Sequence, residues 1–225
     1  AHGCELVGGD TTQGPLNICI TVFGEVPVVD GKSQALLRSG ARAGDDLYVS
    51  GTLGDARMAL EALRGTLILP PALLALARHR LEQPTPRVAL GQALRGVATA
   101  ALDISDGLMG DLRHILKASG VGATLDIATA TNLIAAHTHP ALETGLIPPE
   151  KQLEYVLAGG DDYELAFTAP ASAREAVRAA SRQAGTPVTR IGRIEAEPGI
   201  RLLDASGQPV PNHFSSFDHF AQAQA

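Results

Sequence analysis

The sequence predicts an α+β fold, because helical and strand-like patterns follow one another without the strict strand–helix alternation of a doubly wound sheet. The 225 residues suffice for one large domain or two smaller ones. The 45% hydrophobic and 19% charged residues are typical of a globular protein that buries a core. We expect a domain boundary near residues 30–42, where proline, glycine and polar residues cluster.

Strands are predicted where apolar residues alternate or form short runs between turn residues. Residues 16–23 alternate in the manner of a half-buried strand, and a turn with a short edge is expected at residues 26–31. Residues 205–208 supply a turn for a hairpin that leads into Val210. Further strand signals lie at residues 47–50, 124–127, 163–168, 188–194 and 200–204.

Helices are predicted where apolar residues recur at spacings of three and four. Two of these segments begin with proline, which suits a first helical turn because that position needs no backbone N–H donor. The predicted helices are residues 55–63, 71–80, 86–99, 106–118 and 172–184, and residues 129–158 are expected to be mostly helix and loop.

Composition argues against several classes of partner. The net charge of −6 disfavours nonspecific nucleic-acid binding, for which a basic face would be expected. No stretch approaches the roughly 18 uninterrupted apolar residues that span a membrane, and no signal peptide is visible. Cys4 and Cys19 lack zinc-like spacing, and we interpret them as reduced packing residues. The sequence thus predicts a cytoplasmic protein without nucleic-acid or membrane partners.

The most informative segment is Asp103-Ile104-Ser105-Asp106-Gly107, which joins an apolar run to a helical pattern. Two carboxylates three residues apart, with a hydroxyl between them, can converge on a hard cation where a strand gives way to a helix. Such oxygen-rich clusters suit Mg²⁺. An ordinary helix start is the alternative, because Ser and Asp are also preferred N-cap residues.

A second acidic turn, Gly8-Gly9-Asp10-Thr11-Thr12, follows a short apolar pair. Its glycines allow close approach to a bulky anion, and its exposed amides can form an anion-binding nest. The alternative is a tight turn in which the aspartate satisfies its own backbone. The segment matches neither the Walker A pattern nor the dinucleotide-binding fingerprint.

A third cluster is Gly159-Gly160-Asp161-Asp162-Tyr163-Glu164-Leu165, which leads into a strand-like run. Its three acids repel one another unless cations, amides or a positively charged ligand offset them. Without further context, a solvated turn is the simpler interpretation.

Together these segments resemble the thiamine-monophosphate kinase family, whose superfamily includes aminoimidazole-ribotide synthetase and selenophosphate synthetase. The matches occur in the family's order and spacing and cover almost the whole chain. They are Val7-Gly8-Gly9-Asp10-Thr11-Thr12, Leu37-Arg38-Ser39-Gly40 with Gly44-Asp45, residues 103–108 and 159–165, and Phe217-Asp218-His219-Phe220.

The resemblance implies a kinase that transfers the γ-phosphoryl group of ATP to thiamine monophosphate, directly and in line, in a homodimer. The implied Mg²⁺ ligands are Asp10, Asp103 and Asp106, and the implied ATP contacts are Gly9, Asp10, Arg38 and Ser105.

The resemblance also implies a substrate site. Asp161 stands where the family places an acidic residue against the thiamine moiety, often Glu. Phe217 stands where it usually has an aromatic residue, whose ring can stack on a cationic heterocycle. A family segment with two arginines appears here as Gln83-Pro84-Thr85-Pro86-Arg87; its first arginine is absent, and we assign this stretch no catalytic role.

The implied architecture is that of aminoimidazole-ribotide synthetase, with two domains. Residues 1–35 would be the remainder of an N-terminal ATP- and metal-binding sheet domain, and residues 36–225 a C-terminal α+β domain. Family members are longer, and we expect the N-terminal third to be missing here. Two alternatives stay open: a sister ATP-dependent enzyme of the superfamily, or a truncated chain that only binds or dimerises.

Overall fold

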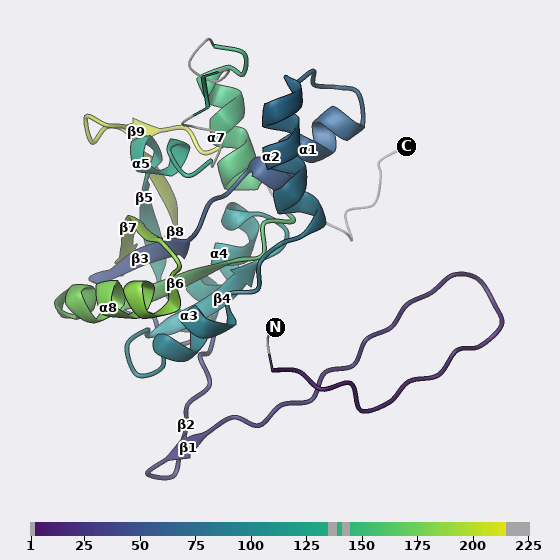
Figure 1. Ribbon diagram of the computed structural model, residues 1–225. Coiled ribbons are helices and arrows are strands. Elements are labelled where there is room, and N and C mark those ends of the chain that lie inside the picture. The colour runs from purple at the N-terminus through teal and green to yellow at the C-terminus, as the bar shows by residue number, and fades with distance from the viewer. Residues whose placement is uncertain (1–2, 135–138, 141–144, 215–225) are drawn as a thin grey trace. The chain divides into compact units, whose positions relative to one another are not determined.

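The computed structural model describes residues 3–134, 139–140 and 145–214, and it divides the chain into residues 1–35 and 36–225 (Figure 1). In the first unit, the strands β1 (Val28–Val29) and β2 (Lys32–Ser33) form an antiparallel hairpin. This hairpin confirms the turn with a short edge predicted at residues 26–31.

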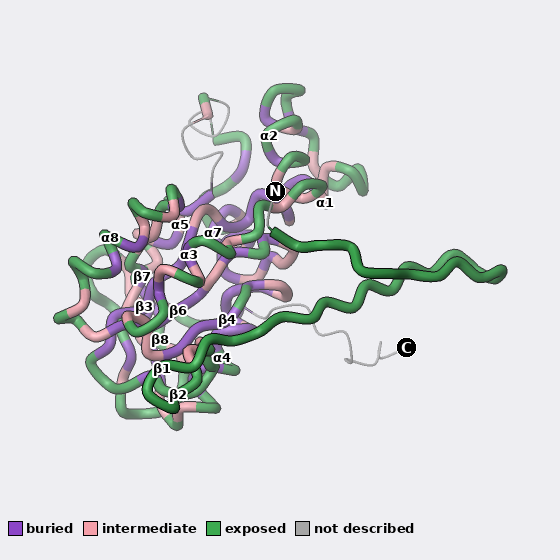
Figure 2. Tube along the Cα trace, turned by 60° about the horizontal axis from the view of Figure 1, so that its bottom comes forward, coloured by how far each residue is buried: buried purple, intermediate pink, exposed green. Residues whose placement is uncertain are grey.

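The strand predicted at residues 16–23 is wrong in this structure. Every residue from 3 to 33 is exposed, as Figure 2 shows in green, and β1 and β2 are the only strands among the described residues of the first unit. Alternation predicts which face of a strand would be buried, but a strand also needs a neighbour for its backbone hydrogen bonds. Cys4 and Cys19 lie in this exposed stretch, so the expectation that they are packing residues is also wrong.

The second unit is built on a mixed sheet, seven-stranded over the described residues, in the order β4-β6-β3-β7-β5-β8-β9. Neighbouring strands are antiparallel except for the parallel pair β5 and β8. The strands are β3 (Asp45–Ser50), β4 (Ala100–Ile104), β5 (Gly122–Asp126), β6 (Glu164–Pro170), β7 (Val188–Glu195), β8 (Gly199–Leu203) and β9 (Pro209–Val210).

Helices cover both faces of this sheet. They are α1 (Asp55–Leu63), α2 (Pro71–Glu82), α3 (Val88–Ala93), α4 (Leu108–Ser119), α5 (Ile127–Thr131), α7 (Pro149–Ala158), the 3₁₀ turn η2 (Ala171–Ala173) and α8 (Arg174–Ala184). None of the described helices is long and apolar enough to cross a membrane.

Strand alternation divides the core into two layers. On β3, the side chains of Leu47 and Val49 join the larger core beneath α1, α2, α4, α5 and α7. Between them, Tyr48 points to the opposite face, where its ring stacks on Phe167 at 5.2 Å beneath α3 and α8. Figure 1 shows α3 and α8 together on this second face.

Most of the predicted helices are confirmed, and α1 has the predicted bounds. The helix predicted at residues 86–99 is shorter, because α3 covers only Val88–Ala93. The backbone N–H of Thr99 donates to Thr168 O at 2.8 Å, so the chain leaves the helix early to join the sheet. The α+β prediction is confirmed by the mixed sheet with helices on both faces.

Because β7 and β5 pack closely at Gly192, alanine substitutions at Gly192 and at Gly91 should have opposite effects on stability. A Cβ atom at Gly192 would lie 2.1 Å from the backbone oxygen of Thr124, whereas one at Gly91, inside α3, would meet nothing within 4 Å. We expect Gly192→Ala to lower the free energy of unfolding by about 1–3 kcal/mol. Gly91→Ala should raise it by about 0.5–1 kcal/mol, because glycine is a poor helix former. Urea denaturation of both variants measures the difference; equal effects would contradict the sheet packing.

Candidate functional site

The turn between β4 and α4, which we call the elbow (residues 104–107), is shaped by a carboxylate one turn into the helix. Asp111 Oδ2 accepts the backbone N–H groups of Ser105, Asp106 and Gly107 at 2.9, 3.0 and 3.1 Å. Burial raises the pKa of Asp111, and its three amide hydrogen bonds oppose that rise. Asp111 was not among the predicted site residues, because an aspartate inside a helical pattern carries no sign that it will bind the preceding turn.

Helix α4 begins directly after the elbow. Its N-cap position is Gly107, which has no side chain for the usual cap hydrogen bond. Neither Ser105 nor Asp106 occupies that position, so the expectation that one of them is the N-cap residue is wrong.

The third acidic cluster lies directly against the elbow. The backbone N–H of Asp161 donates to Ser105 O at 2.8 Å, and that of Tyr163 donates to Ile104 O at 2.9 Å. A Cβ atom at Gly160 would lie 2.6 Å from Ser105 O, so only glycine permits this approach. Residues about 57 positions apart in the sequence thus become neighbours, as expected for β4 and β6 paired side by side.

Three of the predicted site residues gather around one phenol. Burial raises the pKa of Tyr163, and the negative charges of Asp161, Asp106 and Asp103 raise it further, in that order. The side chain of Tyr163 is nevertheless 45% exposed. The elbow therefore presents concentrated negative charge beside an accessible aromatic ring.

A small cavity of about 170 Å³ adjoins this cluster. Its lining combines Ser105, Asp106, Gly160 and Asp161 with Arg57 and Leu60 of α1 and with Arg64, which directly follows that helix. The two arginines were missed by the sequence analysis, since arginines on a helix surface usually face solvent. Both arginines and two aspartates line the cavity, and Arg57 Nε also donates to Glu61 at 3.3 Å. Basic and acidic residues in one lining suit a ligand with both negative and positive groups.

The other two acids of the third cluster are buried, so the solvated-turn interpretation is wrong for them. Asp162 accepts the Gly54 N–H with both carboxylate oxygens, at 3.1 and 3.0 Å, at the start of α1. Burial raises the pKa of Asp162 well above its ordinary value. Amides and cations offset these acids, which was the other possibility considered.

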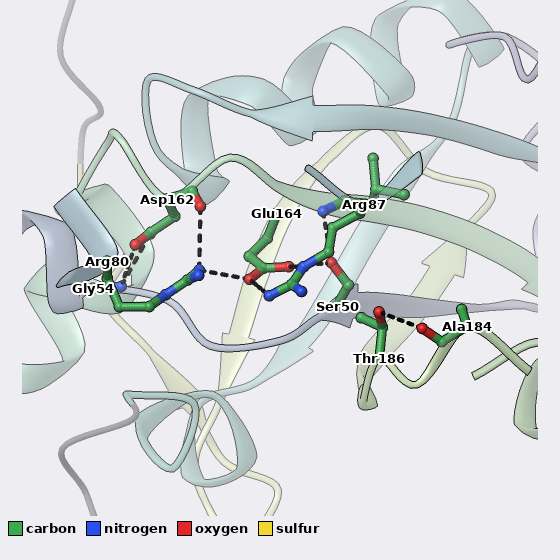
Figure 3. A network of polar contacts seen from close by, with 9 residues as sticks. Ser50, Gly54, Arg80, Arg87, Asp162, Glu164, Ala184 and Thr186 are labelled. Atoms are coloured by element: carbon green, nitrogen blue, oxygen red, sulfur yellow. Dashed lines mark hydrogen bonds and ion pairs between the residues drawn. The ribbon is translucent and has the colours of Figure 1, made fainter. Parts of the chain in front are cut away.

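Glu164 is fully buried between two arginines (Figure 3). Arg87 donates to Glu164 through Nε at 2.6 Å and Nη2 at 2.5 Å, and Arg80 Nη2 donates at 2.6 Å. Ser50 Oγ donates to the same carboxylate at 2.5 Å. The sequence left Arg87 without a role in chemistry, and the structure gives it a buried ion pair.

The remaining predicted residues are Arg38, Gly9, Asp10 and Phe217. Arg38 is exposed, and Ser119 Oγ donates to its backbone oxygen at 3.4 Å. Ser119 ends the 12-residue α4, about 18 Å along the helix from the elbow. Gly9 and Asp10 belong to the first unit, where Asp10 Oδ1 accepts the Thr11 N–H at 2.8 Å. Phe217 lies outside the described residues.

Comparison with known proteins identifies the family. Residues 42–205 match the family model of the AIR synthase related protein, C-terminal domain. The chain belongs to this family. Its mixed seven-stranded sheet, over the residues described, is accordingly an AIR synthase C-terminal-like domain.

Relatives of this AIR synthase related chain confirm the resemblance to thiamine-monophosphate kinases. The chain is 41% identical to the thiamine-monophosphate kinase of Escherichia coli K12, over 98% of this chain and 65% of that one. The thiamine-monophosphate kinase structure from Stenotrophomonas maltophilia K279a is 42% identical, with a TM-score of 0.67 over 79% of this chain and 54% of that one. AaThiL complexed with AMPPCP and TMP is 31% identical, with a TM-score of 0.63 over 82% and 54%. The chain thus spans less than two thirds of the length of these relatives.

The buried carboxylates Asp162 and Asp46 should affect the pH dependence of the free energy of unfolding in opposite directions. The pKa of Asp162 is raised above 3.8 by burial, so the folded state holds its proton more tightly than the unfolded chain does. The contribution of Asp162 to the free energy of unfolding falls as the pH rises above about 4, so the stability of Asp162→Asn relative to the wild type should increase from that pH upward. The pKa of Asp46 is lowered below 3.8, chiefly by its hydrogen bond from Arg174. Its contribution is present above about pH 4 and is lost below it.

Denaturation of the wild type, Asp162→Asn and Asp46→Asn from pH 3 to 7 tests this pair. The free-energy difference between wild type and Asp46→Asn should shrink as the pH falls below about 4. Parallel pH profiles for the two variants would refute the assigned burial of these charges.

Proposed function

We propose that this chain supplies the larger part of an ATP-dependent kinase that converts thiamine monophosphate to thiamine diphosphate. The observation that carries the proposal is the cluster of Asp103, Asp106 and Asp161 around the elbow, in a chain 41% identical to a thiamine-monophosphate kinase over 98% of its length. A related structure was solved with AMPPCP and TMP, which supports a nucleotide and a phosphate ester as the two substrates.

The reaction proposed is a direct in-line transfer. An oxygen of the thiamine monophosphate phosphate attacks the γ-phosphorus of ATP, that bond forms, and the bond to the β,γ-bridging oxygen breaks, which releases ADP. Phosphoryl transfer needs positioning and charge neutralisation more than covalent participation by the protein. We therefore assign no aspartate as a nucleophile and expect no phosphoenzyme.

The donor set fits Mg²⁺. Among the described residues no group of three or more His, Cys, Asp or Glu is arranged to hold a metal ion by itself. Mg²⁺ is commonly held by one or two carboxylates together with waters and substrate phosphates. Asp103 and Asp106 would provide these carboxylates, with Asp10 as a further ligand. The bound ion would neutralise charge on the phosphoryl oxygens.

The elbow and its loop would also select the substrates. Thiamine carries a permanent positive charge, which Asp161 and the aromatic ring of Phe217 would both favour. The guanidinium groups of Arg57 and Arg64 would attract phosphate oxygens. Gly9, Asp10, Arg38 and Ser105 would contact ATP. We further propose a homodimer in the cytoplasm.

Turnover of thiamine monophosphate with ATP and Mg²⁺ tests the proposed function. We expect thiamine diphosphate and ADP in equal amounts from the longest chain that the reading frame encodes, assayed beside the 225-residue chain. Activity in the longer chain alone would mean that the additional residues complete the site. Absence of product in both chains would exclude a thiamine-monophosphate kinase and favour a sister enzyme or a binding protein.

Two substitutions separate the proposed roles at the elbow. Asp106→Asn should lower kcat by at least about 100-fold, because a metal ligand stabilises the transition state by several kcal/mol. Asp161→Asn should raise KM for thiamine monophosphate about 10-fold or more and leave KM for ATP unchanged, since one charged contact is lost. Glu175→Gln serves as the control, because Glu175 is an exposed residue of α8 that forms an ion pair with Arg178. Equal kinetics for all three variants would contradict these roles.

A further inference from the structure

The loop that carries Asp161 and Tyr163 is conformationally strained. Asp161 has a φ of 66° and Tyr163 a φ of 50°, in the left-handed region that side chains with a Cβ atom rarely adopt. Such backbone persists only where the surrounding structure holds it, and it is common at functional sites. Its neighbours must therefore supply the restraint.

The restraint comes from the residues between and after the strained positions. Along residues 161–164, the side chains alternate between the site and the interior: Asp161 and Tyr163 face outward, and Asp162 and Glu164 are buried at 1% and 0% exposure. Asp162 is fixed by the Gly54 amide at the start of α1. Each strained residue thus has a buried, hydrogen-bonded carboxylate next to it.

The second anchor of the loop is the carboxylate of Glu164, whose hydrogen-bond partners come from distant parts of the sequence. Arg80 of α2 donates to Glu164 Oε1 at 2.6 Å and to the backbone oxygen of Asp162 at 3.3 Å, so one guanidinium holds both anchors (Figure 3). Arg87, just before α3, binds Glu164 through two donors, and Ser50 completes the set from β3. The carboxylate fills its space, because a Cβ atom at Gly51 would lie 2.2 Å from Glu164 Oε1.

We propose that Glu164, with Arg80 and Arg87, is a positioning group for the reaction, which holds the strained loop so that Asp161 faces the substrate. This inference rests on the proposed function. Arg80 and Arg87 act on the loop through the Glu164 carboxylate and, for Arg80, the Asp162 backbone oxygen. Replacing Glu164 by Gln removes the negative charge and one of the two acceptor oxygens, so that Arg80, Arg87 and Ser50 can no longer all be paired and the loop is released.

The chain offers a matched control in Asp46. This carboxylate is also buried, at 2% exposure, and is also bound by two arginines: Arg174 at 2.6 and 3.0 Å and Arg190 at 2.5 Å. Asp46 lies four residues from Ser50 along β3, about 13 Å for an extended strand, and pairs with Ala169 at the far end of β6. Its loss should destabilise the fold without reaching the loop.

The experiment compares Glu164→Gln with Asp46→Asn by amide hydrogen exchange and by steady-state kinetics on the longest encoded chain. Both variants should unfold more easily than the wild type. Only Glu164→Gln should speed exchange at residues 160–163, and only this variant should raise KM for thiamine monophosphate, by about 10-fold or more over Asp46→Asn. KM for ATP should change in neither.

Two outcomes would contradict a positioning role for Glu164. Exchange at residues 160–163 that stays at the wild-type rate in Glu164→Gln, or a KM equal to that of Asp46→Asn, overturns the proposal. If Glu164→Gln does not fold, Arg87→Gln carries the same comparison against Arg174→Gln. A wild type that does not phosphorylate thiamine monophosphate contradicts the proposed function instead, and hydrogen exchange still shows whether Glu164 holds the loop.

Discussion

Two backbone hydrogen bonds, from Asp161 N–H to Ser105 O and from Tyr163 N–H to Ile104 O, join the loop before β6 to the turn after β4. They continue the β4–β6 ladder past the point where Ile104 pairs with Glu164. Because the ladder fixes the register, two acidic segments from distant parts of the chain reach the same edge of the sheet. The site exists only because this pairing holds.

The acidic residues around the candidate site fall into two groups, buried carboxylates that stabilise the fold and accessible carboxylates that can bind a ligand. Glu164 and Asp162 are buried and paired, and each fixes a position in the loop. Asp111 accepts hydrogen bonds from the backbone amides of the elbow. Asp103, Asp106 and Asp161 lie near Tyr163, whose pKa their negative charges raise. A bound cation stabilises carboxylates that are gathered in this way, so the site is suited to binding one.

The sequence was sufficient where the signal is local and insufficient where a partner is distant. Glycine and acid patterns placed the elbow and the loop, and proline and apolar spacing placed α1 and α2 closely. Nothing local shows that Asp162 and Glu164 are buried whereas Asp161 is half-exposed, because their partners Gly54 and Arg87 lie 108 and 77 residues away.

Long-range contacts also explain the wrong strand prediction in the first unit and the two arginines of the cavity that were not predicted. The alternation at residues 16–23 predicts a strand, yet the described residues of the first unit provide no neighbour for it. Arg57 and Arg64 line the cavity only because α1 lies over the loop, and the Gly54–Asp162 contact fixes the start of that helix. Tertiary contacts, rather than propensity, decided each of these outcomes.

The central claim is that Asp103 and Asp106, where β4 gives way to α4, bind Mg²⁺ beside the loop that carries Asp161. Its most direct test is Mn²⁺ titration, with Mn²⁺ as a paramagnetic stand-in for Mg²⁺, of the ¹⁵N-labelled chain observed by NMR. We expect the amide signals of residues 103–107 and 160–163 to broaden first, and Asp106→Asn to abolish this preference. Broadening centred on another acidic surface, such as Glu150 and Glu154 of α7, or unchanged broadening in the variant, would contradict it.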